Sequence, residues 1–147
     1  MNDQFFMSEA IREAKLALNL LEVPVGCVIV KDGEIIARGH NLKETEQDVT
    51  SHAEINAIKI ASKKIGSWRL NECTIYVNLE PCLMCMGAIV SARFSTLVYG
   101  LRDKKYASLD DILERYLKNY NHQLEIRTGI MAEESRELLD TFFAKLR

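Results

Sequence analysis

Apolar residues near the start of the chain recur every three or four positions. The series is Met7, Ala10, Ile11, Ala14, Leu18 and Leu21, with charged residues between its members. This is the spacing of one face of an amphipathic helix, so the pattern predicts a first helix.

The next apolar segments are short and rich in β-branched residues. Residues 25–30 and 35–38 flank an Asp32-Gly33 pair, which is typical of a tight turn. We therefore expect an antiparallel hairpin here. After a polar stretch, helical spacing returns between His52 and Ile65.

The second half of the pattern alternates strands with helices. Residues 74–77 and 96–99 read as strands on either side of a helix over 82–93, which predicts parallel strands with a right-handed crossover. A further helix (109–117), strand (124–127) and closing helix (138–146) follow. The sequence thus predicts an α/β fold in which helices cover a mixed sheet of about five strands.

Composition limits the class of protein. The 147 residues fit one domain, spanning 1–147, and 48% hydrophobic with 27% charged residues is ordinary for a globular protein. The net charge of −2 argues against broad, non-specific binding to phosphates, although Arg102, Lys104 and Lys105 leave a compact contact open.

We expect a cytoplasmic protein with no membrane partner. No apolar run approaches the roughly 20 residues of a membrane helix, and charges interrupt the first helix where a signal peptide would be apolar. Thiols stay reduced in that compartment. Cys27 and Cys73 lie in or beside apolar runs and are expected to be buried.

Two short motifs carry candidate chemistry. His52-Ala53-Glu54 supplies an imidazole and a carboxylate, and Pro81-Cys82-Leu83-Met84-Cys85 supplies two thiols. One imidazole and two thiolates make three zinc ligands and leave the fourth position open, as in catalytic rather than structural zinc sites. The carboxylate is not needed as a ligand.

Both motifs are expected at helix starts. Pro81 suits the first helical position, which would put Cys82 and Cys85 in the first turn, where the helix dipole favours thiolates. His52 begins its own helix. Two helix starts at the same end of a sheet can bring the three ligands together.

Each piece also has a simpler interpretation. Ser51 and Glu54 match a helix capping box, a single histidine is more often structural, and a lone C-x-x-C fits zinc, redox chemistry or chance. The ordered combination, H-x-E followed by P-C-x-x-C, is the signature of zinc deaminases that act on nucleobases. It favours a catalytic zinc with Glu54 as the group that moves protons from water to substrate.

A wider set of segments, distributed over nearly the whole chain, resembles one deaminase family. The segments are Glu22-Val23-Pro24-Val25-Gly26, His40-Asn41, Ser51 to Glu54, Ser67 to Leu70, Tyr76 to Cys82, Met84 to Ile89 and Asn121-His122-Gln123. Together they are similar to bacterial tRNA-specific adenosine deaminases, of the cytidine/deoxycytidylate deaminase superfamily.

The resemblance implies a three-layer α/β/α cytidine deaminase-like fold and a homodimer with one Zn²⁺ per subunit. It also implies hydrolytic deamination of adenosine to inosine at the wobble position of a tRNA anticodon stem-loop, with no DNA partner. Carried over by matching position, His52, Cys82 and Cys85 are ligands and Glu54 is the proton shuttle. Substrate-binding positions by the same match are Asn41, Val25, Gly26 and Ala53.

Two alternatives remain open. Residues 105–111 contain no glycine and two acids, whereas the family usually has a glycine-rich loop near its RNA. A deaminase of a free base or nucleoside (guanine, cytosine or adenosine) is therefore the rival. A non-catalytic zinc or RNA-binding module would require a lost ligand or shuttle, and none is missing here.

Overall fold

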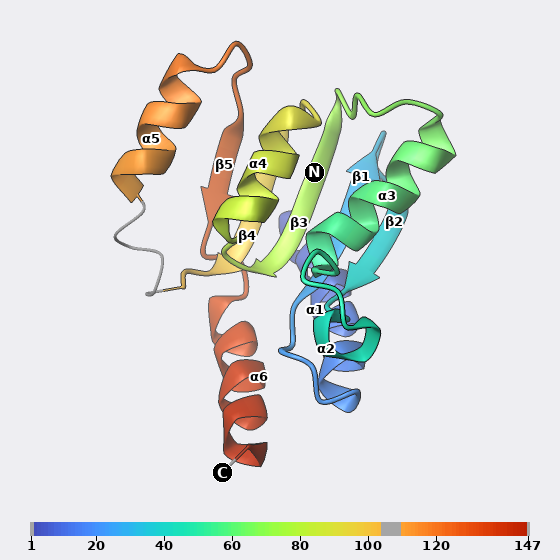
Figure 1. Cartoon of the computed structure of the whole chain (residues 1–147), viewed down its shortest axis with the longest axis vertical. Coiled ribbons are helices and arrows are strands. Elements are labelled where there is room, and N and C mark those ends of the chain that lie inside the picture. The colour runs from blue at the N-terminus through green and yellow to red at the C-terminus, as the bar shows by residue number, and fades with distance from the viewer. Residues whose placement is uncertain (1, 104–109, 147) are drawn as a thin grey trace.

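A five-stranded mixed sheet lies at the centre of the computed structural model, which describes residues 2–103 and 110–146 (Figure 1). The strand order is β2-β1-β3-β4-β5. The strands are β1 (Gly26–Lys31), β2 (Glu34–His40), β3 (Cys73–Leu79), β4 (Thr96–Leu101) and β5 (Glu125–Thr128). β1 pairs antiparallel with β2 and with β3, whereas β3, β4 and β5 run parallel. The predicted hairpin and parallel strand pair are confirmed.

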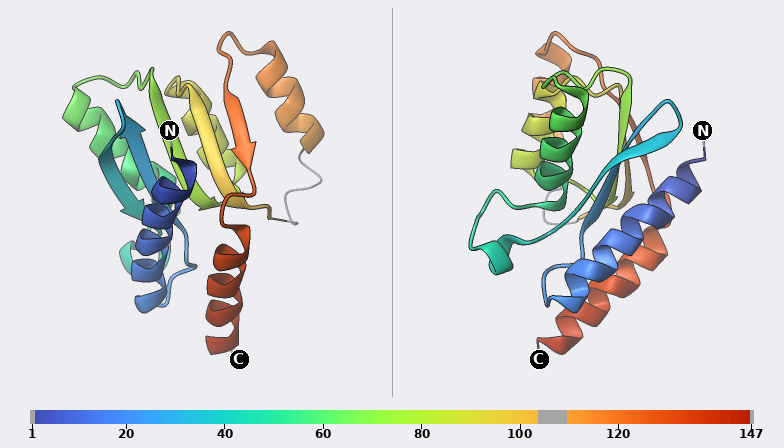
Figure 2. Two further views of the ribbon diagram at one scale, coloured as in Figure 1. Left: turned by 180° about the vertical axis from the view of Figure 1, so that it is seen from behind. Right: turned by 90° about the vertical axis from the view of Figure 1, so that its right-hand side faces the viewer.

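Helices cover both faces of the sheet, as Figure 2 shows from the side. They are α1 (Asp3–Asn19), α2 (Lys43–Glu46), α3 (Ala53–Ile65), α4 (Leu83–Ser91), α5 (Asp110–Asn119) and α6 (Ala132–Lys145). One apolar core joins α3 and α4 to the sheet, and a second joins α1 to the opposite face, with α6 beside it. The predicted three-layer α/β/α arrangement is therefore confirmed.

Three helix predictions need correction. The short helix α2 was not expected, because four residues carry no readable periodicity. α6 begins at Ala132, six residues before the predicted start, since its first half is mostly polar. α4 is shorter than the predicted 82–93 and starts after Cys82. Leu109, the predicted start of the helix before β5, lies outside the described residues.

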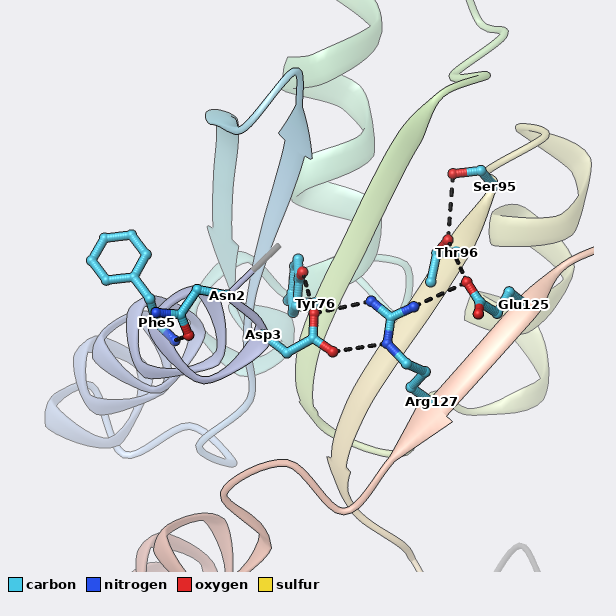
Figure 3. Close-up of polar contacts among 8 residues, drawn as sticks. All are labelled: Asn2, Asp3, Phe5, Tyr76, Ser95, Thr96, Glu125 and Arg127. Carbon is cyan, nitrogen blue, oxygen red and sulfur yellow. Dashed lines mark hydrogen bonds and ion pairs between the residues drawn. The ribbon is translucent and has the colours of Figure 1, made fainter.

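The amino-terminal helix is tied to the far strand by a polar network (Figure 3). Arg127 of β5 donates two hydrogen bonds to Asp3, at 2.8 and 3.0 Å, and Tyr76 of β3 donates a third at 2.7 Å. Arg127 also donates to Glu125 at 2.9 Å. This network fixes the first turn of α1 to the sheet, whereas Leu18 and Asn19 lie at the other end of the helix.

Over residues 2–103 and 110–146, no helix combines the length and the apolar character that spanning a membrane requires.

Candidate metal centre and active site

The ends of several elements meet at one edge of the sheet. β1 begins there at Gly26 and its partner β2 ends there at His40, opposite each other in register. β3 ends at the same edge, because it runs antiparallel to β1. α3 and α4 start directly after connections that leave this edge. The helix-start residues that the sequence singled out are therefore brought to one place.

His52, Cys82 and Cys85 converge at that edge. The Nδ1 atom of His52 lies 3.6 Å from Sγ of Cys82 and 3.5 Å from Sγ of Cys85. All three candidate ligand atoms lie within 4.8 Å of one another. One imidazole and two sulfurs this close form a candidate metal-binding group whose donor set suits zinc.

The two sulfurs sit differently from the prediction. Cys82 is the N-cap of α4, in an extended conformation, and Pro81 precedes the helix instead of opening it. Cys85 lies in the first turn and is buried. The expectation that Pro81 takes the first helical position is thus wrong, although both sulfurs still face the helix start.

Contacts among the three groups favour a thiolate. A hydrogen bond from the Cys85 thiol, together with His52, lowers the pKa of Cys82 to about 4 despite its burial. The same shared proton raises the pKa of Cys85 far above its usual range. A metal ion needs deprotonated sulfur, and here it would replace the proton that the pair shares.

Glu54 does not act as a helix cap, so the capping-box alternative is wrong. The N-cap of α3 is His52, whose side chain makes no capping hydrogen bond. Ser51 Oγ instead contacts Glu46 at 2.5 Å and the Asn56 side chain at 3.1 Å. The carboxyl group of Glu54 is therefore available for another role.

The Glu54 side chain is buried at 3% exposure, one residue beyond Ala53 in the first turn of α3. Burial raises the pKa of its carboxyl to about 7. A group with a pKa near neutrality both accepts and releases a proton readily at physiological pH, which suits general acid–base catalysis.

A cavity of about 380 Å³ opens beside this cluster. Of the predicted site residues, those that line it are Val25, Asn41, His52, Ala53, Glu54 and Cys82. Gly26 is not among the lining residues in the described part of the chain. Its backbone N–H donates to Asn78 Oδ1 at 2.8 Å, so Gly26 anchors the neighbouring Val25, which lines the cavity, to β3.

Sequence reasoning missed several residues of this wall. Glu22 comes from the connection after α1, Lys43 is the first residue of α2, and Glu80 follows β3. Phe142 comes from α6 and Leu146 is the C-cap of that helix, 90 and 94 residues from His52 along the chain. A sequence signal existed for Glu22 and Glu80, because both lie in segments that carry the family resemblance, Glu22 to Gly26 and Tyr76 to Cys82.

Part of the predicted RNA-facing region is not described. Lys104, Lys105 and most of the 105–111 segment lie outside the described residues. The neighbouring Arg102 is 53% exposed, with Nε 3.7 Å from Oε1 of Glu80.

Comparison with known proteins places this chain among deaminases. A family model described as MafB19-like deaminase matches residues 1–147. A tRNA-specific adenosine deaminase of Bacillus subtilis (strain 168) is 47% identical over 148 residues, covering 99% of this chain and 91% of the relative.

Two solved structures are also similar. One comes from a study of A-to-I editing by tRNA:A34 deaminases at the wobble position, with a TM-score of 0.85 and 39% identity over 92% of this chain and 99% of that chain. The other is a guanine deaminase from Bacillus subtilis, with a TM-score of 0.68 and 39% identity over 82% of this chain and 78% of that chain.

Proposed function

The chain belongs to the family of tRNA-specific adenosine deaminases, and from this premise we propose that it converts adenosine to inosine at the wobble position of a tRNA anticodon. The observation that carries the chemistry is the convergence of His52, Cys82 and Cys85 beside a cavity that Glu54 also lines. In this proposal residues 1–147 form a single zinc-dependent deaminase domain that works in the cytoplasm.

His52, Cys82 and Cys85 hold one Zn²⁺ per subunit in this proposal. When bound, zinc supplies a Lewis acid that makes water a nucleophile near neutral pH. Because the protein provides only three ligands, they would leave one coordination position of the ion free, as catalytic zinc sites require.

Glu54 moves the protons. Its carboxylate takes a proton from the attacking water and delivers it to a ring nitrogen of adenine, which makes the adjacent amino-bearing carbon electrophilic. After the hydroxyl adds to that carbon, Glu54 transfers the hydroxyl proton to the amino group. The amine leaves as ammonia, and a carbonyl remains on the ring.

The remaining predicted residues form the base pocket. Asn41, Val25 and Ala53 line the cavity and are proposed to contact the flipped nucleotide, with Gly26 supporting Val25. An anticodon loop is single-stranded and turns its base outward at low cost, so a small cavity suffices for recognition.

A homodimer fits the exposed apolar side chains of α3 and α4. Ile60, Leu83 and Met84 are 48%, 51% and 37% exposed. α4 is apolar along almost its whole length, although only part of it faces the core. A second copy of the chain covering this face would bury them. Light scattering of the zinc-loaded protein tests this directly: a monomer at micromolar concentration would contradict it.

The deciding experiment compares substrates. Zinc-loaded protein is incubated with an anticodon stem-loop carrying adenosine at the wobble position, with the same stem-loop carrying guanosine there, and with free guanine, cytosine and adenosine. Inosine formed only in the first RNA supports the proposal. Ammonia released only from a free base would support the second candidate, which the similarity to the guanine deaminase structure favours.

A further inference from the structure

The wall of the cavity contains a buried carboxylate that the proposed mechanism does not use. Glu22 is 1% exposed and lies in the connection between α1 and β1. Its oxygens accept hydrogen bonds from the backbone N–H groups of Glu44 at 3.1 Å and Thr45 at 2.6 Å. Both donors belong to α2, more than 20 residues along the chain.

α2 depends on this contact. Its N-cap, Leu42, makes no side-chain capping hydrogen bond. The first backbone N–H groups of a helix need acceptors from outside it, and a four-residue helix has too few hydrogen bonds of its own to persist alone. Glu22 therefore supplies from a distance what a capping residue normally supplies locally.

The carboxyl group of Glu22 is held in its ionised form. Burial by itself would raise its pKa, but hydrogen bonds from Thr45 and Glu44 outweigh burial, and the pKa is lowered overall. A carboxylate forms stronger hydrogen bonds than a neutral acceptor, which suits a group that fastens one segment to another.

The same two segments are joined at Asn41. Its backbone N–H donates to the carbonyl of Val25 at 3.0 Å, and its side chain donates to the carbonyl of Val23 at 3.3 Å. Its Oδ1 accepts from the N–H of Lys43 at 3.1 Å. Asn41 therefore keeps its place in the cavity only while the segments 22–25 and 41–45 stay together.

Segment 22–25 is itself rigidly supported. Asn78 of β3 is fully buried; its side chain donates to the carbonyl of Pro24 at 3.0 Å and accepts from the N–H of Gly26 at 2.8 Å. Segment 22–25 is thus fixed to the central strand β3, and α2 is in turn fixed to segment 22–25 through Glu22.

We propose that Glu22 is a positioning residue for the deamination, which acts by holding α2 against segment 22–25 so that Asn41 faces the bound nucleotide. The proposal rests on the proposed function and on Asn41 as a substrate contact. It assigns Glu22 no direct contact with substrate or metal.

A purely structural role for Glu22 predicts something different. In that case its removal would lower stability without acting specifically through Asn41. Effects that run through one shared contact are non-additive, whereas independent effects add. A double-mutant cycle between Glu22 and Asn41 therefore separates the two roles.

The experiment compares the wild type with Glu22→Ala, Asn41→Ala and the double variant, all loaded with zinc. Glu22→Gln is a second, milder variant, because it keeps the shape and one oxygen acceptor. Glu9→Gln is the matched control: Glu9 is a buried acid that pairs with Arg38 and lies outside the cavity lining. The measurements are zinc per chain, the dissociation constant of the adenosine stem-loop, kcat and KM, and hydrogen exchange of the Glu44 and Thr45 amides.

We expect Glu22→Ala to lower kcat/KM by about 10- to 100-fold, mostly through KM, because a misplaced contact group costs up to about 100-fold. The kcat/KM of Glu22→Gln should lie between those of the wild type and Glu22→Ala. The zinc content of both variants should stay at the wild-type value. The Glu44 and Thr45 amides should exchange faster. In the Asn41→Ala background, adding Glu22→Ala should lower kcat/KM by less than about threefold.

Three results would overturn the proposal: wild-type affinity and kcat/KM in Glu22→Ala, full additivity in the cycle, or an equal KM increase in Glu9→Gln. A wild type that binds the stem-loop without forming inosine would instead contradict the proposed function. The cycle on dissociation constants would still decide the role of Glu22.

Discussion

Gly39 of β2 lies directly against Ala53, the residue between His52 and Glu54. A Cβ atom built on Gly39 would lie 2.5 Å from the carbonyl oxygen of Ala53 and 2.8 Å from the backbone nitrogen of Ala57. Both are atoms of the α3 backbone, which cannot swing aside as a side chain can. The absence of a side chain at position 39 thus sets how closely α3, the helix that begins after His52 and carries Glu54, approaches the sheet.

Gly39→Ala should therefore damage the site. The added methyl group must push the first turns of α3 outward, which moves His52 away from the two sulfurs. We expect zinc affinity to fall by about tenfold or more, the size of effect seen when ligand orientation is disturbed. Competition with a chromogenic zinc chelator measures it.

Gly33→Ala is the control for this change. Gly33 has no atom within 4 Å of its Cβ position, but its φ of +77° disfavours alanine. It should lose about 1 kcal/mol of stability and keep wild-type zinc affinity. Equal zinc affinity in Gly39→Ala and wild type would contradict the packing argument.

Replacing any of the three proposed ligands should remove the metal. His52→Ala, Cys82→Ser and Cys85→Ser each leave only two strong ligands, so we expect well below one zinc per chain by elemental analysis and a lower melting temperature. Cys73→Ser is the comparison, because Cys73 is buried like Cys85 but lies outside the group. Stoichiometric zinc in His52→Ala would show that the group does not bind the metal as assigned.

Glu54→Gln should separate metal binding from catalysis. The amide keeps the size of the side chain but cannot accept and release protons, so we expect full zinc occupancy with kcat lower by about 10²- to 10⁴-fold. Inosine formation in the stem-loop is the measurement. Glu72→Gln makes the same change at an exposed site and should retain full activity, while near-normal turnover in Glu54→Gln would refute the shuttle.

The Asp3–Arg127 pair should make stability depend on pH in the acid range. The hydrogen bonds from Arg127 lower the pKa of Asp3 below its ordinary value of 3.8, against the opposing effect of burial. A carboxyl whose pKa is lower in the folded state stabilises that state above the unfolded pKa, and this contribution is lost as the pH falls through the folded value.

Asp3→Asn should thus reduce the free energy of unfolding by about 1 kcal/mol at pH 7, a difference that disappears well below pH 3.8. Urea unfolding of both proteins from pH 7 to pH 2 tests this. Asp140→Asn, on the exposed side of α6, should follow the wild type throughout. A constant difference between Asp3→Asn and wild type down to pH 2 would contradict the assignment.

The candidate metal-binding group was predictable because its residues are local in sequence. His52 and Glu54 are two residues apart and Cys82 and Cys85 are three apart, so each pair is fixed by the start of one helix. The exact helix start was less predictable. Pro81 fits the first helical position on propensity, yet the backbone of Cys82 is extended and Leu83 is the first helical residue.

The remainder of the cavity depends on contacts between distant segments. α2 carries too few residues for a periodic pattern and is stabilised by Glu22 from another connection. The first half of α6 carries no hydrophobic pattern that would predict its packing, because its fully buried residue is the polar Ser135. Nothing local therefore shows that this helix delivers Phe142 to the cavity.

The course of α6 has a practical consequence for handling the protein. Leu146, the C-cap of α6, lines the cavity. Asp3 begins the 17-residue α1, and Leu21 and Glu22, just beyond the other end of that helix, line the cavity as well. An affinity tag or fusion partner joined beyond α6 would emerge where a large RNA must approach. One joined ahead of α1 would start about 25 Å away, so amino-terminal tagging and immobilisation are the orientation of choice for assays with whole tRNA.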